Sequence, residues 1–464
     1  MINLPNSPAV EKFVTRMTAE GLPTLFIENF KHYYQLLVSG ESGLIPEKNI
    51  QAVDSLPDAE TFSQRYFEVG ETVLPQTAVI KLNGGLGTSM GLQQAKSLLP
   101  VKEEITFLDI IAKQVEAKDL PLVLMNSFST DQDTLDKLAP YQHLQSKDIP
   151  LRFLQHKQPK VRQDDFQPAI WDENPNLEWC PPGHGDIYTA LITSETLDAL
   201  LAKGYQYAFV SNVDNLGAAI DVSILGYFAD KQIPFMMEVA DRTLMDKKGG
   251  HLAMQADGQL ILRESAQCPD EDMASFQDIN KHKYFNTNNL WLHLPSLKKV
   301  MDANEAKLGL PMIRNAKTVD PRNKKSTPVF QIETAMGSAI GVFKGAQAVR
   351  VPRTRFAPVK TTNDLLVVRS DAYALTDDFR LVQAEPGKKL QVSLDSDYYK
   401  LVSDFNGRFP HGVPSIKQCK SLKISGDIAF GKNITCVGDV ELVNTNSKQV
   451  IIPDGTTLEG KIEF

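Results

Sequence analysis

The sequence predicts an α/β protein with helices at the N-terminus, a doubly wound mixed sheet in the middle and a parallel β-helix at the C-terminus. Two observations carry this prediction. From about residue 75, short apolar runs alternate with helical stretches, which is typical of strands that are connected by helices in a mostly parallel sheet. Near the C-terminus, apolar residues recur every six positions, and this period is typical of a parallel β-helix.

More than one domain is expected, because a single core rarely extends over 464 residues. Residues 8–38 carry two helical stripes of apolar side chains, and a connector rich in Gly and Pro follows them. The strands of the sheet are predicted at residues 78–82, 121–125, 151–154, 207–211 and 234–239. The expected division is 1–60 for the helical segment, 61–385 for the sheet domain and 386–464 for the C-terminal domain.

The six-residue repeat has two registers. Leu422, Ile428, Ile434 and Val440 form one, and the other consists of Ile424, Phe430, Cys436 and Leu442. A plain β-meander stays open as an alternative, because only a few coils are present. Stacked coils leave a flat, rigid wall, so self-association through this domain is expected.

Composition narrows the class of protein. The apolar share is 42%, the charged share is 23% and the net charge is −8, which argue for a globular protein and against nucleic acid as a partner. No apolar run approaches membrane-spanning length, so no membrane partner is expected. The four cysteines are far apart and lack metal spacing, which favours a cytoplasmic protein with reduced thiols.

The strongest local signal is a glycine-rich loop directly after the first predicted strand. It places Gly84, Gly85, Gly87 and Gly91 within eight residues, and Lys96 follows. Glycines allow successive N–H groups to turn to one side and bind an anion, most often phosphate. The spacing fits neither the Walker A loop nor the dinucleotide fingerprint. A hairpin tip is the alternative, but the strand before the loop and the lysine after it favour a nucleotide loop.

Two further segments carry candidate ligands. Asp214 follows the apolar run 207–211, where the carboxyl end of a strand would present it to a ligand. Carboxylate oxygens suit Mg²⁺, although such a residue also serves in turns. His184 stands in a segment fixed by two prolines and two glycines, 181–188. A surface histidine in a structural turn is the alternative there.

Leu82–Gly91 resembles, position by position, the nucleotide loop of the eukaryotic-type UDPGP family, the UTP–glucose-1-phosphate uridylyltransferases. Pro181–Tyr188 and Phe285–Trp291 are similar to two further family motifs, whereas Ala95 replaces the family proline before the lysine. The resemblance covers about residue 75 to the C-terminus. It implies a glycosyltransferase-A-like sheet domain that acts as a nucleotidyltransferase, and a left-handed parallel β-helix.

The resemblance also implies the site. Catalytic roles are expected for Lys96 and Lys360. The expected nucleotide contacts are Leu82, Asn83, Gly84, Gly85, Gln155, Gly183 and Asp214, and among these Gln155 pairs with uracil. The expected sugar-phosphate contacts are Gly85, His184, Asn212, Glu264 and Asn288. Asp214 is the expected ligand of Mg²⁺, the implied cofactor.

Some assignments stay open. Asn286 is an alternative to Asn288 as the sugar contact, and the segment around Glu264 keeps only part of the family pattern. Arg353, Arg355 and Lys360 together also suit a solvated face. Residues 331–336 match the family without a role that can be assigned.

The function implied is Mg²⁺-dependent transfer of a uridylyl group from UTP to glucose 1-phosphate, by direct in-line attack, which gives UDP-glucose and pyrophosphate. A pyrophosphorylase for UDP-N-acetylhexosamines or for several UDP-sugars is the alternative. Its loops usually carry an arginine that the segment 88–91 lacks. A silent nucleotide-sugar-binding regulator is disfavoured by the joint presence of Lys96, Asp214 and Lys360.

Overall fold

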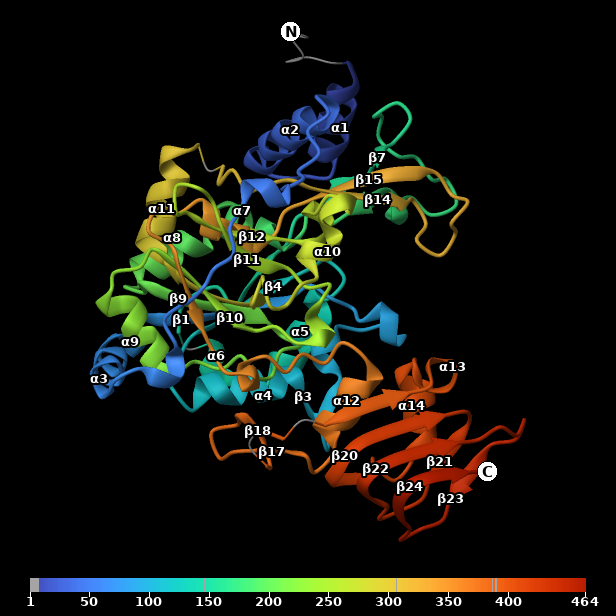
Figure 1. Ribbon diagram of the computed structural model, residues 1–464. Helices are drawn as coiled ribbons and strands as arrows, with labels where there is room; N and C mark the ends of the chain where they lie inside the picture. The colour runs from blue at the N-terminus through green and yellow to red at the C-terminus, as the bar shows by residue number, and fades with distance from the viewer. Residues whose placement is uncertain (1–7, 146, 306, 386, 389) are drawn as a thin grey trace.

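The structure is a computed structural model that describes residues 8–145, 147–305, 307–385, 387–388 and 390–464 (Figure 1). Within them, nine strands form one central sheet, ordered β12, β11, β13, β9, β1, β4, β5, with β10 beside β13 and β16 beside β10. Its strands are β1 (Thr77–Asn83), β4 (Leu122–Asn126), β5 (Arg152–Leu154), β9 (Tyr207–Asn212), β10 (Phe235–Asp241), β11 (His251–Met254), β12 (Leu260–Arg263), β13 (Tyr284–His293) and β16 (Gln347–Arg350). The five strands predicted from apolar runs are therefore confirmed.

The sheet is mixed. Strand β1 pairs in parallel with both β4 and β9, whereas β13 runs antiparallel to β9 and β10. Leu82 lies opposite Asn212, so the parallel strands β1 and β9 end at the same edge of the sheet. That edge carries the glycine loop and the segment with Asp214, as the prediction for the carboxyl ends of the strands requires.

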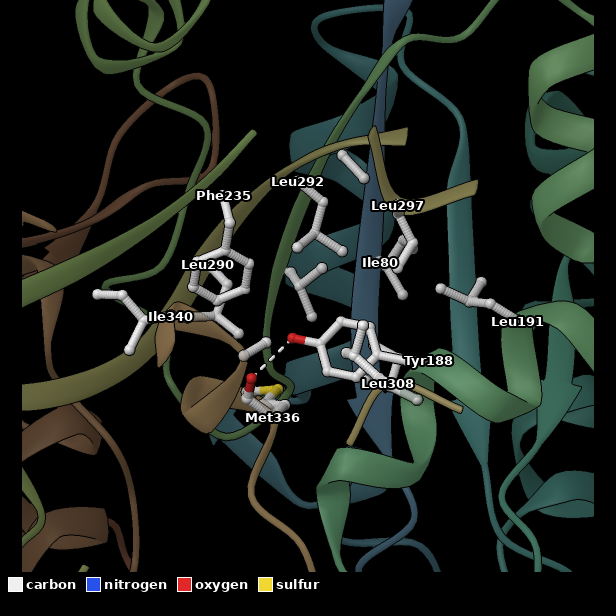
Figure 2. Close-up of a cluster of buried hydrophobic side chains, with 14 of the residues drawn as sticks. Ile80, Tyr188, Leu191, Phe235, Leu290, Leu292, Leu297, Leu308, Met336 and Ile340 are labelled. Atoms are coloured by element: carbon white, nitrogen blue, oxygen red, sulfur yellow. Dashed lines mark hydrogen bonds between the residues drawn. The ribbon is translucent and has the colours of Figure 1, made fainter. Parts of the chain in front are cut away.

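Helices cover both faces of the sheet, which confirms the doubly wound α/β prediction. On one face, Ile80 and Val210 pack with helices whose bounds are α7 (Ile187–Thr193), α8 (Thr196–Ala202) and α11 (Leu294–Ala303) (Figure 2). On the other face, Val79 and Phe209 pack with helices whose bounds are α4 (Phe107–Glu116), α5 (Asp131–Leu138), α6 (Gln142–Gln145) and α9 (Val222–Asp230). The odd and even residues of β1 thus serve opposite layers, as strand geometry demands.

The predicted N-terminal helices form as α1 (Pro8–Ala19) and α2 (Thr24–Val38). Their apolar stripes meet in one cluster, where the rings of Phe13 and Phe30 lie 5.2 Å apart. The cluster reaches a small sheet of β7 (Val161–Arg162), β14 (Ile313–Thr318) and β15 (Pro328–Glu333). The remaining larger helices are α3 (Gln64–Val73) and α12 (Thr362–Arg369). Among the described residues, every helix is too short or too polar to cross a membrane.

The C-terminal region consists of parallel strands stacked on one another (red in Figure 1). Leu422 pairs with Val440, which lies three six-residue steps further along the chain, and all eight predicted apolar positions are buried. The parallel pairing makes the β-meander alternative wrong. The elements of the C-terminal region are β19 (Gln391–Leu394), α13 (Ser396–Tyr399), α14 (Val402–Arg408), β20 (Ser415–Ser425), β21 (Ile428–Phe430), β22 (Thr435–Val443), β23 (Val450–Ile452) and β24 (Thr457–Glu463).

Candidate active site

The glycine loop turns back on itself at the end of β1. Gly87 and Gly91 have φ angles of +69° and +76°, a left-handed conformation that disfavours side chains. A Cβ on Gly87 would also lie 2.8 Å from Leu92. The N–H of Lys96 donates to the carbonyl of Gly85 at 3.0 Å, which brings the lysine back to the start of the loop. The loop therefore has the shape and the nearby cation that a phosphate cradle needs.

Two expected nucleotide contacts lie in the strand rather than in the loop. The Asn83 side chain is buried and donates to Asn126 and Thr134, both at 2.8 Å. The carbonyl of Leu82 accepts from the N–H of Val213 at 3.1 Å. In this structure both residues fix the end of β1, and Asn83 does so through its Nδ2 group.

The structure brings Lys96 and Asp214 into direct contact. The Lys96 Nζ lies 2.7 Å from Asp214 Oδ2, and the side chains are 13% and 19% exposed. Asp214 stands two residues beyond Asn212, the last residue of β9. A loop after β1 and a loop after β9 thus supply one cation and one carboxylate at the same edge of the sheet, within reach of a ligand.

A second group surrounds the expected base pocket. Gln155 donates from Nε2 to the carbonyl of Gly183 at 3.1 Å, and a Cβ on Gly84 would lie 3.0 Å from Gln155 Oε1. Gly84, Gln155 and Gly183 are therefore neighbours, although they come from three separate segments. The lack of a side chain at Gly84 leaves Oε1 accessible as a hydrogen-bond acceptor.

His184 is held in one tautomer by residues 331–336, for which sequence analysis assigned no role. The N–H of Met336 donates to His184 Nδ1 at 2.9 Å, so the ring proton sits on Nε2. Met336 is itself anchored, because its carbonyl accepts from the hydroxyl of Tyr188 at 2.7 Å (Figure 2). Gly183 has a φ of +80°, and a Cβ there would lie 2.4 Å from the carbonyl of Thr334. Residues 331–336 therefore clamp the histidine loop.

We expect His184 to act as a neutral donor. Burial lowers the pKa of His184 to about 4, so the ring is uncharged across pH 5–8. In wild type and His184→Leu, which has no donor, kcat/KM for glucose 1-phosphate should follow parallel pH profiles, with the variant lower by roughly 10- to 100-fold for one lost bond to a charged group. Steady-state kinetics between pH 5 and 8 provide the measurement. A wild-type profile that alone falls as the pH rises through 6.5 would mean that the imidazolium is the active form.

The expected sugar side is built on a bulge in β13. The pairing of β10 with β13 shifts between Glu238 and Val239, and Asn288 in the bulge has a φ of +59°. Asn286 and Asn288 hold each other: Asn286 Nδ2 donates to Asn288 Oδ1, and the N–H of Asn288 donates to Asn286 Oδ1, both at 2.8 Å. The two asparagines are bonded to each other, so the structure does not separate Asn286 from Asn288 as the contact to the sugar.

Glu264 and Lys360 lie near each other across the site. Burial raises the pKa of Glu264, and the positive charge of Lys360 opposes that rise. A Cβ on Gly250 would lie 2.5 Å from the Glu264 carboxylate, so a side chain there would displace this carboxylate. Lys360 is exposed, and its Nζ lies 5.6 Å from the ring centre of Phe356. A carboxylate and an exposed cation therefore border the region beside the asparagine bulge.

The solvated-face alternative for the three cations is wrong for Arg355. Its guanidinium forms a paired contact with the fully buried Glu238, at 2.8 and 2.6 Å. Glu238 also accepts from Asn289 Nδ2 and Trp291 Nε1, each at 2.9 Å. Arg353 instead lies at the surface beside Asp246.

The backbone of Arg355 and Val359 ties the segment with Lys360 to the segment with Asp214. The carbonyl of Arg355 accepts from Asn215 Nδ2 at 3.1 Å, and the N–H of Val359 donates to the carbonyl of Asp214 at 3.0 Å. Sequence reasoning missed Glu238 and Asn215, because their partners lie 117 and 140 residues away. No local pattern reports such contacts.

A metal would have few protein ligands here. The described part of the chain contains no group of three or more His, Cys, Asp or Glu side chains that could hold a metal ion. Asp214 Oδ2 already accepts from Lys96. A single carboxylate fits an ion that keeps most of its waters and binds substrate phosphates, which is the habit of Mg²⁺.

The chain is similar to known proteins over most of its length. The family model for UTP–glucose-1-phosphate uridylyltransferase matches residues 27–436. A probable UTP–glucose-1-phosphate uridylyltransferase of Schizosaccharomyces pombe is 39% identical over 425 residues, which cover 89% of this chain and 80% of the relative. The UTP–glucose-1-phosphate uridylyltransferase of Solanum tuberosum is 42% identical over 400 residues, which cover 84% of this chain and 81% of the relative.

Solved structures agree over nearly the whole chain. The UDP-glucose pyrophosphorylase of Leishmania major, known in open and closed structures, is 46% identical with a TM-score of 0.91, covering 99% of this chain and 100% of that one. A variant of it in complex with UDP-glucose is 45% identical with a TM-score of 0.91, covering 98% of this chain and 99% of that one. With a family match from residue 27 to residue 436 and these relatives, the chain belongs to the UTP–glucose-1-phosphate uridylyltransferase (UDPGP) family.

Proposed function

We propose that the chain transfers the uridylyl group of UTP to glucose 1-phosphate and releases pyrophosphate and UDP-glucose. The contact between Lys96 and Asp214 carries the proposal, because it sets a cation and a carboxylate beside a loop shaped for phosphates. Membership of the family supports it, and so does the similarity to a structure that binds UDP-glucose.

The reaction needs no general base. A phosphate oxygen of glucose 1-phosphate, already ionised, attacks the α-phosphorus of UTP. The bond from that phosphorus to the oxygen that bridges to the β-phosphate breaks, and pyrophosphate leaves with the electron pair. Positioning and neutralisation of charge then supply the catalysis.

The proposed roles follow from where each group lies. Lys96 neutralises the phosphates from the side of the glycine loop, and Lys360 does so from the side of Glu264. Gln155 accepts from the N3–H of uracil through Oε1, and His184 donates from Nε2 to the sugar phosphate. The remaining sugar-phosphate contacts are proposed for Gly85, Asn212, Glu264 and Asn288.

Asp214 is the residue proposed to hold Mg²⁺, with water and phosphate oxygens as the other ligands. Bound there, the ion would offset the negative charge that develops on pyrophosphate. Asp214 and Lys96 neutralise each other in the structure, and substrate phosphates would offer Lys96 a second partner. The carboxylate then becomes free to face a cation.

We also propose the division into residues 1–60, 61–385 and 386–464, a cytoplasmic location and a left-handed hand for the C-terminal β-helix. The parallel pairing of strands three six-residue steps apart supports the β-helix. The hydrophobic core of the β-helix also includes Leu99 and Val359 of the sheet domain, so one core extends across the proposed boundary near residue 386.

Self-association through the β-helix gives a testable expectation. Ile451 on β23 is a large apolar side chain of the stacked strands that is 67% exposed. Ile451→Lys should lower the mass measured by light scattering towards that of one chain. Ile170 is equally exposed, at 67%, and lies before the β-helix, so Ile170→Lys is the matched control and should leave the mass unchanged. An unchanged mass in the Ile451 variant, with wild type associated, would contradict this surface.

Pyrophosphate release from UTP against a panel of sugar 1-phosphates tests the function. Glucose 1-phosphate should give the highest kcat/KM. Preference for an N-acetylhexosamine 1-phosphate, or equal use of several sugars, would favour the alternative pyrophosphorylases. Binding of UTP without turnover on any sugar would mean a silent regulator and overturn the proposal.

A further inference from the structure

Lys81 is a buried lysine in β1, three residues before the glycine loop. Its side chain is 2% exposed, and its Nζ donates to Ser211 Oγ at 2.6 Å and to the carbonyl of Ala218 at 2.7 Å. No role in binding or catalysis follows from the resemblance for this residue. Burial of an amine costs free energy unless its N–H groups donate hydrogen bonds, so the hydrogen bonds of Lys81 indicate what the residue does here.

The two acceptors mark the ends of the segment that carries Asp214. Ser211 is in β9, and Ala218 lies just beyond the turn that follows the strand. Inside the segment, short bonds shape the turn: Asn215 N–H donates to the carbonyl of Asn212 at 3.3 Å, and Ala218 N–H donates to the carbonyl of Asn215 at 3.1 Å. Lys81 bonds both ends of the segment, Ser211 and Ala218, and so fixes the distance between them.

The two bonds need no charge on Lys81. Burial and, to a lesser extent, the charge of Arg355 lower the pKa of Lys81 to about 7, and Glu238 opposes both effects. A neutral amine still has two N–H groups, enough for Ser211 and Ala218 together. The bridge is therefore geometric, and it persists whether the nitrogen is an amine or an ammonium.

We propose that Lys81 is a positioning residue that fixes the loop of Asp214 against Lys96 for the uridylyl transfer; this role rests on the proposed function. Lys81 does not contact Asp214 in the described structure, but it sets the loop from which that carboxylate projects. Small displacements of a group that orients charge cost about 10²-fold in rate.

The test compares Lys81→Met with Lys160→Met. Lys160 is a matched control, because it is 4% exposed and its Nζ donates to one carbonyl, that of Val319, at 2.9 Å. Lys81→Met should lower kcat about 10²-fold and raise the half-saturating Mg²⁺ concentration. It should also speed amide hydrogen exchange in residues 212–218. Lys160→Met should lose thermal stability while its kcat, Mg²⁺ response and exchange in this segment stay at wild-type values.

Ser211→Ala provides a second variant in case Lys81→Met does not fold. It removes one acceptor, so it should shift the Mg²⁺ response and the exchange in the same direction but by less. Lys81→Met combined with Ser211→Ala should resemble Lys81→Met alone, because both remove the same bridge. Additive effects, or exchange of 212–218 that matches wild type in both single variants, would overturn the proposal. Amide hydrogen exchange tests the position of the loop even if the wild-type protein is inactive. Inactivity of the wild-type protein would contradict the proposed function and not the role of Lys81 in the loop.

Discussion

Lys96→Ala should lower kcat by about 10²–10³-fold while the affinity for UTP changes much less. The reason is where the charge acts: Lys96 Nζ lies 2.7 Å from Asp214 and beside the glycine loop, so it meets the phosphates where charge develops during transfer. Removal also leaves the Asp214 carboxylate without its cation. Steady-state kinetics and calorimetric UTP binding measure the two effects separately.

Lys102→Ala is the control for loss of a nearby lysine. The Lys102 Nζ donates to three backbone carbonyls, those of Val368, Ser370 and Tyr373, and to no carboxylate that the structure describes. We expect that variant to lose thermal stability and to keep its turnover. A folded Lys96→Ala protein with nearly normal kcat would contradict a catalytic role for Lys96.

The sequence predicted the parts of the molecule that local patterns report. Alternation of apolar runs located the parallel strands, since each buried strand must present apolar side chains to a helical layer. The six-residue repeat located the stacked strands, because every coil returns the same register to the core. The glycine loop was visible because left-handed angles at Gly87 and Gly91 need glycine.

The contacts that orient the site could not be predicted, because they join residues far apart in the chain. The bond from Met336 to His184 spans 152 residues, and the bonds of Lys81 span 130 and 137. Asn83 shows a contact that its motif did not predict. The nucleotide contact expected for Asn83 stays a prediction, and its side chain also donates to Asn126 and Thr134 inside the fold. A motif can mark residues that build the site as well as those that touch the ligand.

Asp214→Asn should keep the fold and raise the half-saturating Mg²⁺ concentration by about 10- to 100-fold or more, since even neighbours of metal ligands have effects of this size. The amide can still accept from Lys96, but it carries no charge for a cation.

Asp221→Asn removes the same charge from the same region and is the matched control. Asp221 accepts from the N–H groups of Ser223 and Ile224 at the start of α9, a task that asparagine performs equally well. A magnesium titration of initial rates at saturating UTP compares the three proteins. If Asp214→Asn and Asp221→Asn respond to Mg²⁺ as wild type does, Asp214 serves only the turn and the salt bridge to Lys96, and the ion binds through the substrate phosphates alone.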